Sequence, residues 1–150
     1  MIKLIHILGA ILFLGNLVIS AVWRMQAEKN SERSIKLFSI KLIQRTDLIF
    51  TLPGIVLIAV SGHMLAGKFG GIGAHGWIYH SYAMLTVSAL IWLAGLIPIQ
   101  KKQLRMTQDA EGFDSNLPPY KKLNRLWAIL SGIATLLPLV ALYLMIVRPG

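Results

Sequence analysis

The sequence predicts an all-α fold, a bundle of four transmembrane helices with the N-terminus and the C-terminus on the outer side. Two observations support this prediction. Of the 150 residues, 55% are hydrophobic and only 14% are charged, and the mean hydropathy is +0.65. A helix needs about 20 apolar residues to cross a hydrocarbon core of roughly 30 Å, and four such stretches with their loops fill the chain. We therefore expect one membrane domain over residues 1–150.

The four predicted spans cover about residues 4–23, 48–66, 77–99 and 126–147. The first span follows Met1-Ile2-Lys3 directly, with a single lysine before it and without a small-residue cleavage site followed by a soluble domain. This arrangement is typical of a retained first helix and not of a removable signal peptide.

The basic residues predict the orientation, because positively charged loops resist translocation across the membrane. The first and third loops carry twelve of them: Arg24, Lys29, Arg33, Lys36, Lys41, Arg45, Lys101, Lys102, Arg105, Lys121, Lys122 and Arg125. The other side has only Lys3, Lys68 and Arg148. We expect the first and third loops to face the cytoplasm, and the second loop and both termini to face outward.

The three loops differ in composition. Residues 31–45 place Ile35, Phe38 and Leu42 at helical spacing among basic residues, which favours an amphipathic anchor lying in the lipid headgroups. Residues 67–76 include five glycines, so this second loop should be irregular. The third loop, ending in residues 117–120, should be irregular as well.

Small and polar residues at helical spacing predict which helix faces turn inward. The stripes are His6, Gly9, Phe13, Asn16 and Ser20 in the first span, Asp47, Thr51, Gly54, Ile58 and Ser61 in the second, and Asn124, Ala128, Ser131, Thr135 and Pro138 in the fourth. In the third span the apolar face of His80, with Met84, Val87, Ile91, Ala94 and Pro98, is the candidate interior face. Most of these small polar residues are interpreted as helix-packing contacts.

Two polar residues of the spans need partners. Asn16 lies near the middle of the membrane, where its amide must serve as an interhelical clamp or as part of a site. Asp47 lies in the first turn of the second span, where the helix N-terminus and Arg45 or Arg24 can hold its charge. For Asp47 a structural role is preferred.

All four histidines are predicted to lie in the outer third of the molecule: His6, His63, His75 and His80. Two neutral imidazoles from different helices at one depth can hold a haem, and the spacing favours His6 with His80. His63 is the next candidate haem ligand after these two, because it is turned away from the polar stripe of its helix and could point at headgroups or another subunit instead. His75 should be solvated. The alternative for each is a histidine that snorkels to water.

A haem in this position has two propionates to neutralise. Among the outer cations, Arg148 suits a carboxylate best because its planar fork binds both oxygens. Arg148 is therefore the expected propionate partner, and the alternative is that it anchors the helix end in the headgroups.

Several segments resemble an uncharacterised bacterial family of predicted four-span membrane proteins. The resemblance rests on residues 2–10 (IKLIHILGA), Gly15-Asn16, Trp23, Thr46-Asp47, residues 50–54 (FTLPG) and residues 98–100 (PIQ). It implies a multi-pass protein of the bacterial inner membrane.

More distantly, the layout is similar to the four-helix membrane protoporphyrinogen oxidases and the copper-resistance D proteins. The similar features are the Lys-x-x-His start at Lys3 and His6, Gly76-Trp77, and Val147-Arg148-Pro149. The resemblance to the oxidases implies haem b binding at His6. Residues 78–82 (IYHSY) lack the lysine that the oxidases carry after Gly-Trp, so the sequence does not support porphyrinogen oxidation.

The function predicted from the sequence is haem b binding, in electron transfer or as an accessory subunit of a membrane redox complex. One alternative is copper handling by His6, His63 and His80 with Met64 and Met84. Another is a cofactor-free subunit that packs against partner membrane proteins or other copies of itself. Nucleic-acid binding is excluded because the basic residues flank apolar spans, and thiolate ligands are excluded because the chain has no cysteine.

Overall fold

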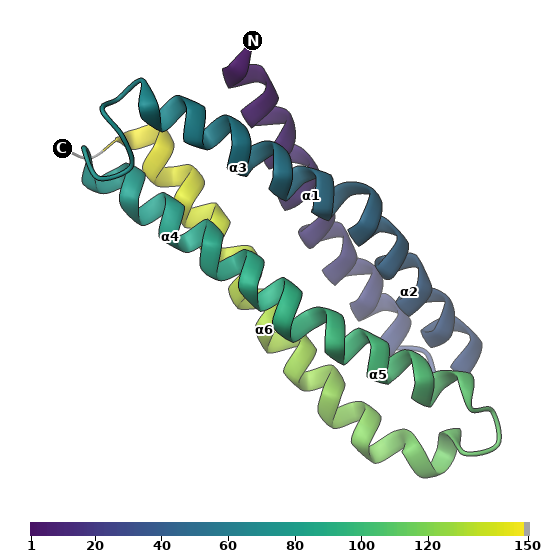
Figure 1. Ribbon diagram of the computed structural model, residues 1–150. Coiled ribbons are helices and arrows are strands. Elements are labelled where there is room, and N and C mark those ends of the chain that lie inside the picture. The colour runs from purple at the N-terminus through teal and green to yellow at the C-terminus, as the bar shows by residue number, and fades with distance from the viewer. Residues whose placement is uncertain (149–150) are drawn as a thin grey trace.

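The protein is an all-helical membrane bundle, shown as a computed structural model that describes residues 1–148 (Figure 1). The helices are α1 (Ile2–Glu28), α2 (Arg33–Thr46), α3 (Leu52–Gly67), α4 (Gly76–Leu90), α5 (Ile97–Gln108) and α6 (Phe113–Val147). Two π-helical turns, η1 (Asp47–Thr51) and η2 (Ile91–Leu96), join α2 to α3 and α4 to α5. The described residues thus form four continuous rods, each long and apolar enough to cross a membrane: Ile2–Glu28, Arg33–Gly67, Gly76–Gln108 and Phe113–Val147.

The start of α1, the end of α6 and the α3–α4 loop lie at one end of the bundle, which we call the terminal end (Figure 1). The α1–α2 and α5–α6 connections lie at the opposite end, which we call the basic end because the twelve basic residues of the first and third loops lie between this end and the middle of the bundle. The two ends therefore differ in charge as the sequence predicts.

The rods are organised as two closely packed pairs, α1 with α3 and α4 with α6. Gly9 and Gly54 bring the first pair into contact, because a Cβ on Gly54 would lie 2.8 Å from the backbone nitrogen of Phe13. In the second pair, Ser81 donates to the carbonyl of Ala141 at 3.3 Å and Ser88 donates to that of Ala134 at 2.6 Å. Small residues thus set the close approach in both pairs.

Each π-helical turn is followed by a proline in the first two positions of the next helix, Pro53 in α3 and Pro98 in α5. Proline has no backbone N–H, so the hydrogen-bond ladder is interrupted at that point. The second and third rods are therefore each divided near their middle.

Two predictions for the loops are wrong. The expected headgroup anchor is α2, which runs in line with α3 and buries Ile40 and Ile43 against its neighbours, while Phe38 is 66% exposed. The second error concerns residues 117–120, which lie inside α6, where Tyr120 is fully buried. The loop of residues 68–75 is irregular, as predicted, with positive φ at Gly70 and Gly71.

The helix faces were predicted well for two spans and poorly for the others. Gly9, Phe13, Asn16 and Ser20 are buried, and so is the whole stripe from Asp47 to Ser61. In α6 the buried face is rotated, since Ala128 is exposed and the buried residues are Tyr120, Trp127, Ser131, Ala134, Pro138 and Ala141. In the third rod the His80 face turns outward, and the buried residues are Ile78, Ser81, Ser88, Trp92 and Leu96.

Candidate functional site

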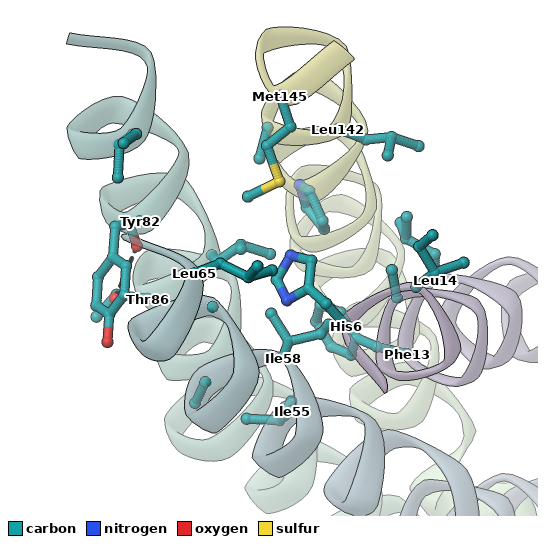
Figure 2. Close-up of a pocket in the computed structure, with 18 of the residues that line it drawn as sticks. His6, Phe13, Leu14, Ile55, Ile58, Leu65, Tyr82, Thr86, Leu142 and Met145 are labelled. Carbon is teal, nitrogen blue, oxygen red and sulfur yellow. Dashed lines mark hydrogen bonds between the residues drawn. The ribbon is translucent and has the colours of Figure 1, made fainter. Parts of the chain in front are cut away.

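An apolar cavity of about 940 Å³ lies at the terminal end, between the α1–α3 pair and the α4–α6 pair. Its walls are mainly aliphatic, and Figure 2 shows His6 among Ile58, Leu65, Leu142 and other apolar side chains. Ligand cavities in proteins are about 300–1,000 Å³ and mostly apolar with a few polar groups. The size and lining of this cavity suit a large apolar ligand.

The imidazole of His6 is held by α3. Its Nδ1 lies 3.0 Å from Ser61 Oγ, and the Ser61 hydroxyl donates its only proton to the carbonyl of Leu57. With the imidazole proton on Nδ1, His6 donates to Ser61 and the Nε2 lone pair is left for a metal. Gly62 provides the space, because a Cβ there would lie 3.1 Å from His6 Cε1.

The structure does not bring the other histidines to His6. His80 is exposed, does not line the cavity, and donates from Nδ1 to the carbonyl of Gly76 at 2.6 Å. His63 is exposed on α3, and His75 is exposed in the loop. The predicted meeting of His6 and His80 fails because the third rod buries the Ser81 and Ser88 face.

Two cations line the terminal end of the cavity, Lys3 and Arg148. The Arg148 guanidinium lies 5.4 Å from the ring centroid of Phe69 and 5.5 Å from that of Trp77, which is the geometry of a cation–π contact. Arg148 and Lys3 thus lie together at the cavity.

One sulfur side chain reaches the cavity without having been predicted. Met145 of α6 lines it, and Figure 2 shows its thioether above the His6 ring in this view. Met64 and Met84 do not line the cavity. Within residues 1–148, no three His, Cys, Asp or Glu side chains are grouped closely enough to hold a metal ion.

A second polar group lies at the middle of the bundle and is centred on Asp47. Asn16 Nδ2 donates to Asp47 Oδ1 at 2.9 Å and to Thr51 Oγ1 at 2.8 Å. Thr51 Oγ1 donates to Asp47 Oδ1 at 3.0 Å, and Gln100 Nε2 donates to Oδ2 at 3.3 Å. We call these four residues the Asp47 network; within residues 1–148 Asp47 has no ion-pair partner, so the expected pairing with Arg45 or Arg24 is wrong.

Arg24 lies instead in a buried polar cluster near the basic end. Its Nε is 3.4 Å from Glu28 Oε1 and donates to Asn124 Oδ1 at 3.1 Å, and its Nη2 donates to the Tyr120 hydroxyl at 3.3 Å. Lys36 Nζ lies 3.0 Å from Glu28 Oε2, and the Tyr120 hydroxyl donates to Glu28. This cluster ties α1, α2 and α6 together.

The fold and composition define a four-span integral membrane protein. The chain belongs to the family described as predicted integral membrane protein (DUF2269), which matches residues 1–149. No curated protein and no solved structure matches the chain. The family description names no activity and no cofactor.

Proposed function

We propose that the protein binds haem b in the cavity at the terminal end, with His6 as an axial ligand, and serves in electron transfer or as an accessory subunit of a redox complex in the bacterial inner membrane. The observation that carries this proposal is the hydrogen bond between His6 Nδ1 and Ser61 Oγ at the wall of the cavity, which allows Nε2 to bind a metal. Metal-binding histidines commonly donate their other ring N–H to a hydroxyl, carbonyl or carboxylate, which fixes the tautomer and orients the ring. Ser61 plays this part for His6.

The remaining residues of the cavity suit the rest of the haem. Its aliphatic walls match an apolar macrocycle, and its volume of about 940 Å³ is sufficient for a large cofactor. Lys3 and Arg148 provide positive charge for two propionates, and arginine can bind a carboxylate through two parallel hydrogen bonds.

A bound haem would supply one-electron chemistry that the side chains cannot supply. The protein would bind and orient the haem. Ser61 holds the His6 ring, Gly62 leaves the space for that ring, and the apolar walls exclude water from the ligand. Met145 is a second side chain at the cavity with an atom that can bind a metal.

Copper handling receives no comparable support from the geometry. His63, His80 and Met64 are exposed, and none of them lines the cavity with His6. The cofactor-free alternative, a subunit that packs against partner membrane proteins, differs from the haem proposal in the spectrum that it predicts.

The test is the absorption spectrum of detergent-purified protein from cells supplied with haem precursor, before and after dithionite. We expect a Soret band, with sharpened bands on reduction, that is lost or weakened many-fold in His6→Ala. His63→Ala and His80→Ala are matched controls, since both side chains face away from the cavity, and they should keep the wild-type spectrum. Wild-type spectrum and stoichiometry in His6→Ala, or protein free of haem after reconstitution, would overturn the proposal.

A further inference from the structure

A row of buried polar side chains continues from the Asp47 network toward the basic end. On α1, Asn16 is followed at one-turn intervals by Ser20 and Arg24. On α5, Gln100 is followed in the same way by Gln103 and Thr107. Ser20 is 4% exposed and Gln103 is 0% exposed, so the row runs through the interior of the bundle and not along its surface.

The side chains in the middle of this row lack hydrogen-bond partners. Among residues 1–148, Ser20 Oγ, both amide atoms of Gln103 and one terminal nitrogen of Arg24 are buried and unpartnered. Buried polar groups in proteins are satisfied by protein atoms or by internal water, which typically makes about three hydrogen bonds in such a place. Internal water between the Asp47 network and the Arg24 cluster would satisfy these atoms, next to the buried apolar side chains Ile43 and Trp127.

The opposite side of the Asp47 network is sealed by apolar packing. Phe13, Leu17 and Ile58 form a buried cluster in which Phe13 is 1% exposed. Phe13 lies one turn from Asn16 and two turns from His6, so this cluster separates the network from the cavity at the terminal end. A hydrated path from the basic end would have to stop at Asp47.

We propose that water enters the bundle from the basic end and forms a chain that ends at Asp47, so that protons reach the middle of the bundle from one side only. A hydronium ion at the head of the chain gives its proton to the Asp47 carboxylate, leaving water and the neutral acid, and the reverse step returns it. The side chains that face Asp47 are neutral: Asn16, Thr51 and Gln100 donate to it, and the indole of Trp92 lies beside it. The nearest charged groups along the row, Arg24 and its partner Glu28, are paired with each other.

The absence of cysteine from the chain makes a direct test possible, because each introduced thiol is then unique. We would place the thiol at Ser20, on the proposed path, and at Ser88, which is also buried but lies in the α4–α6 contact with its hydroxyl bonded to Ala134. The loss of the S–H infrared band in D₂O, measured in vesicles, should be faster in Ser20→Cys than in Ser88→Cys by about tenfold or more.

Equal rates of exchange in the two variants, whether both slow or both fast, would overturn the hydrated path. If Ser20→Cys does not fold, wild-type protein gives the same answer by solid-state NMR: transfer of magnetisation from water should reach the Gln103 side-chain amide, and its absence would overturn the path.

Proton binding at Asp47 is measured separately by infrared spectroscopy. We expect a pH-dependent carboxylic acid band that disappears in Asp47→Asn and responds more slowly to a pH change in Gln103→Leu. A spectrum without such a band, or an unchanged rate in Gln103→Leu, would overturn the proton step.

Discussion

The two halves of the bundle differ in what fills the space between their helices. In the half near the terminal end, four rods enclose an apolar cavity in which His6 bonds to Ser61. In the half near the basic end, the interior holds the Asp47 network and the Arg24 cluster, with side chains of α1, α2, α5 and α6 bonded to one another. In a membrane, a space lined by apolar side chains can be filled by a ligand or a lipid. Buried polar groups, in contrast, cost free energy unless they have hydrogen-bond partners. The polar half therefore fixes the packing, and the apolar half is free to hold a ligand.

The largest expected effect of a mutation is in the polar half. Replacing Arg24 by Met removes the partner of Glu28, Asn124 and Tyr120 from a buried cluster and should lower stability by about 3 kcal/mol. The measurement is thermal unfolding in detergent. Arg125→Met, at an exposed position of α6, should stay within ~0.5 kcal/mol of wild type. An Arg24→Met protein as stable as wild type would show that the polar half does not fix the packing.

A smaller loss is expected where the α1–α3 pair comes together. In Gly54→Ala the new Cβ meets backbone atoms, the nitrogen of Phe13 at 2.8 Å and the carbonyl oxygen of Gly9 at 3.0 Å, which cannot move aside separately. We expect a loss of about 2 kcal/mol by the same unfolding measurement. Gly132→Ala is the control, since nothing lies within 4 Å of a Cβ there. Equal stability of the two variants would contradict the close contact.

In the apolar half, mutations should alter ligand binding more than stability. Gly62→Ala places a Cβ 3.1 Å from His6 Cε1, so the imidazole must shift by a few tenths of an ångström. Haem affinity should fall by about tenfold, equivalent to ~1.4 kcal/mol, while the melting temperature stays near that of wild type. Gly67→Ala, which also lies on α3 with nothing within 4 Å, should bind normally. A lower melting temperature with unchanged affinity would place Gly62 among the packing residues instead.

A weaker effect is expected at Arg148. Its replacement by Ala removes one of the two cations at the cavity, so haem should still bind, with affinity reduced by about 1 kcal/mol or with a shifted midpoint potential. Titration with haem and a redox titration measure the two effects. Lys68→Ala, which removes a cation that does not line the cavity, should change neither. The same result for both variants would assign Arg148 to the anchoring of α6.

The orientation of the two halves can be determined without affecting stability. A reporter fused after Val147 should be active outside the cytoplasm, because the twelve basic residues of the first and third loops lie at the opposite end. A fusion active only in the cytoplasm would show that the bundle has the opposite orientation. The proposed water path would then open to the outer side.

The sequence predicted the fold because long apolar segments and charged loops are local properties of the chain. It also predicted the buried faces of α1 and α3, where small and polar residues repeat on one side. The predicted interior face of the third rod is wrong. The His80 face is exposed, and the spacing of Ser81 and Ser88 marks the buried face.

The candidate site was predictable only in part. His6 and Arg148 were identified from depth and charge, and both line the cavity. The cavity itself depends on how the two helix pairs pack against each other. This packing cannot be predicted from the sequence of any single helix. Ser61 was expected to be a packing residue, and its bond to His6 depends on the register of α1 against α3. The role of Gln100 depends in the same way on the packing of the third rod against α2.

The two π-helical turns have a mechanical consequence. η1 and η2 each precede a proline, and each lies at the level where the polar half meets the apolar half. Bends in helices concentrate at prolines and π-bulges, so we expect the second and third rods to bend at these two positions. Their arms at the terminal end can swing to admit or release a ligand while the arms at the basic end stay bonded in place. The mouth of the cavity can thus open without unfolding any helix and without breaking the contacts that keep the bundle assembled.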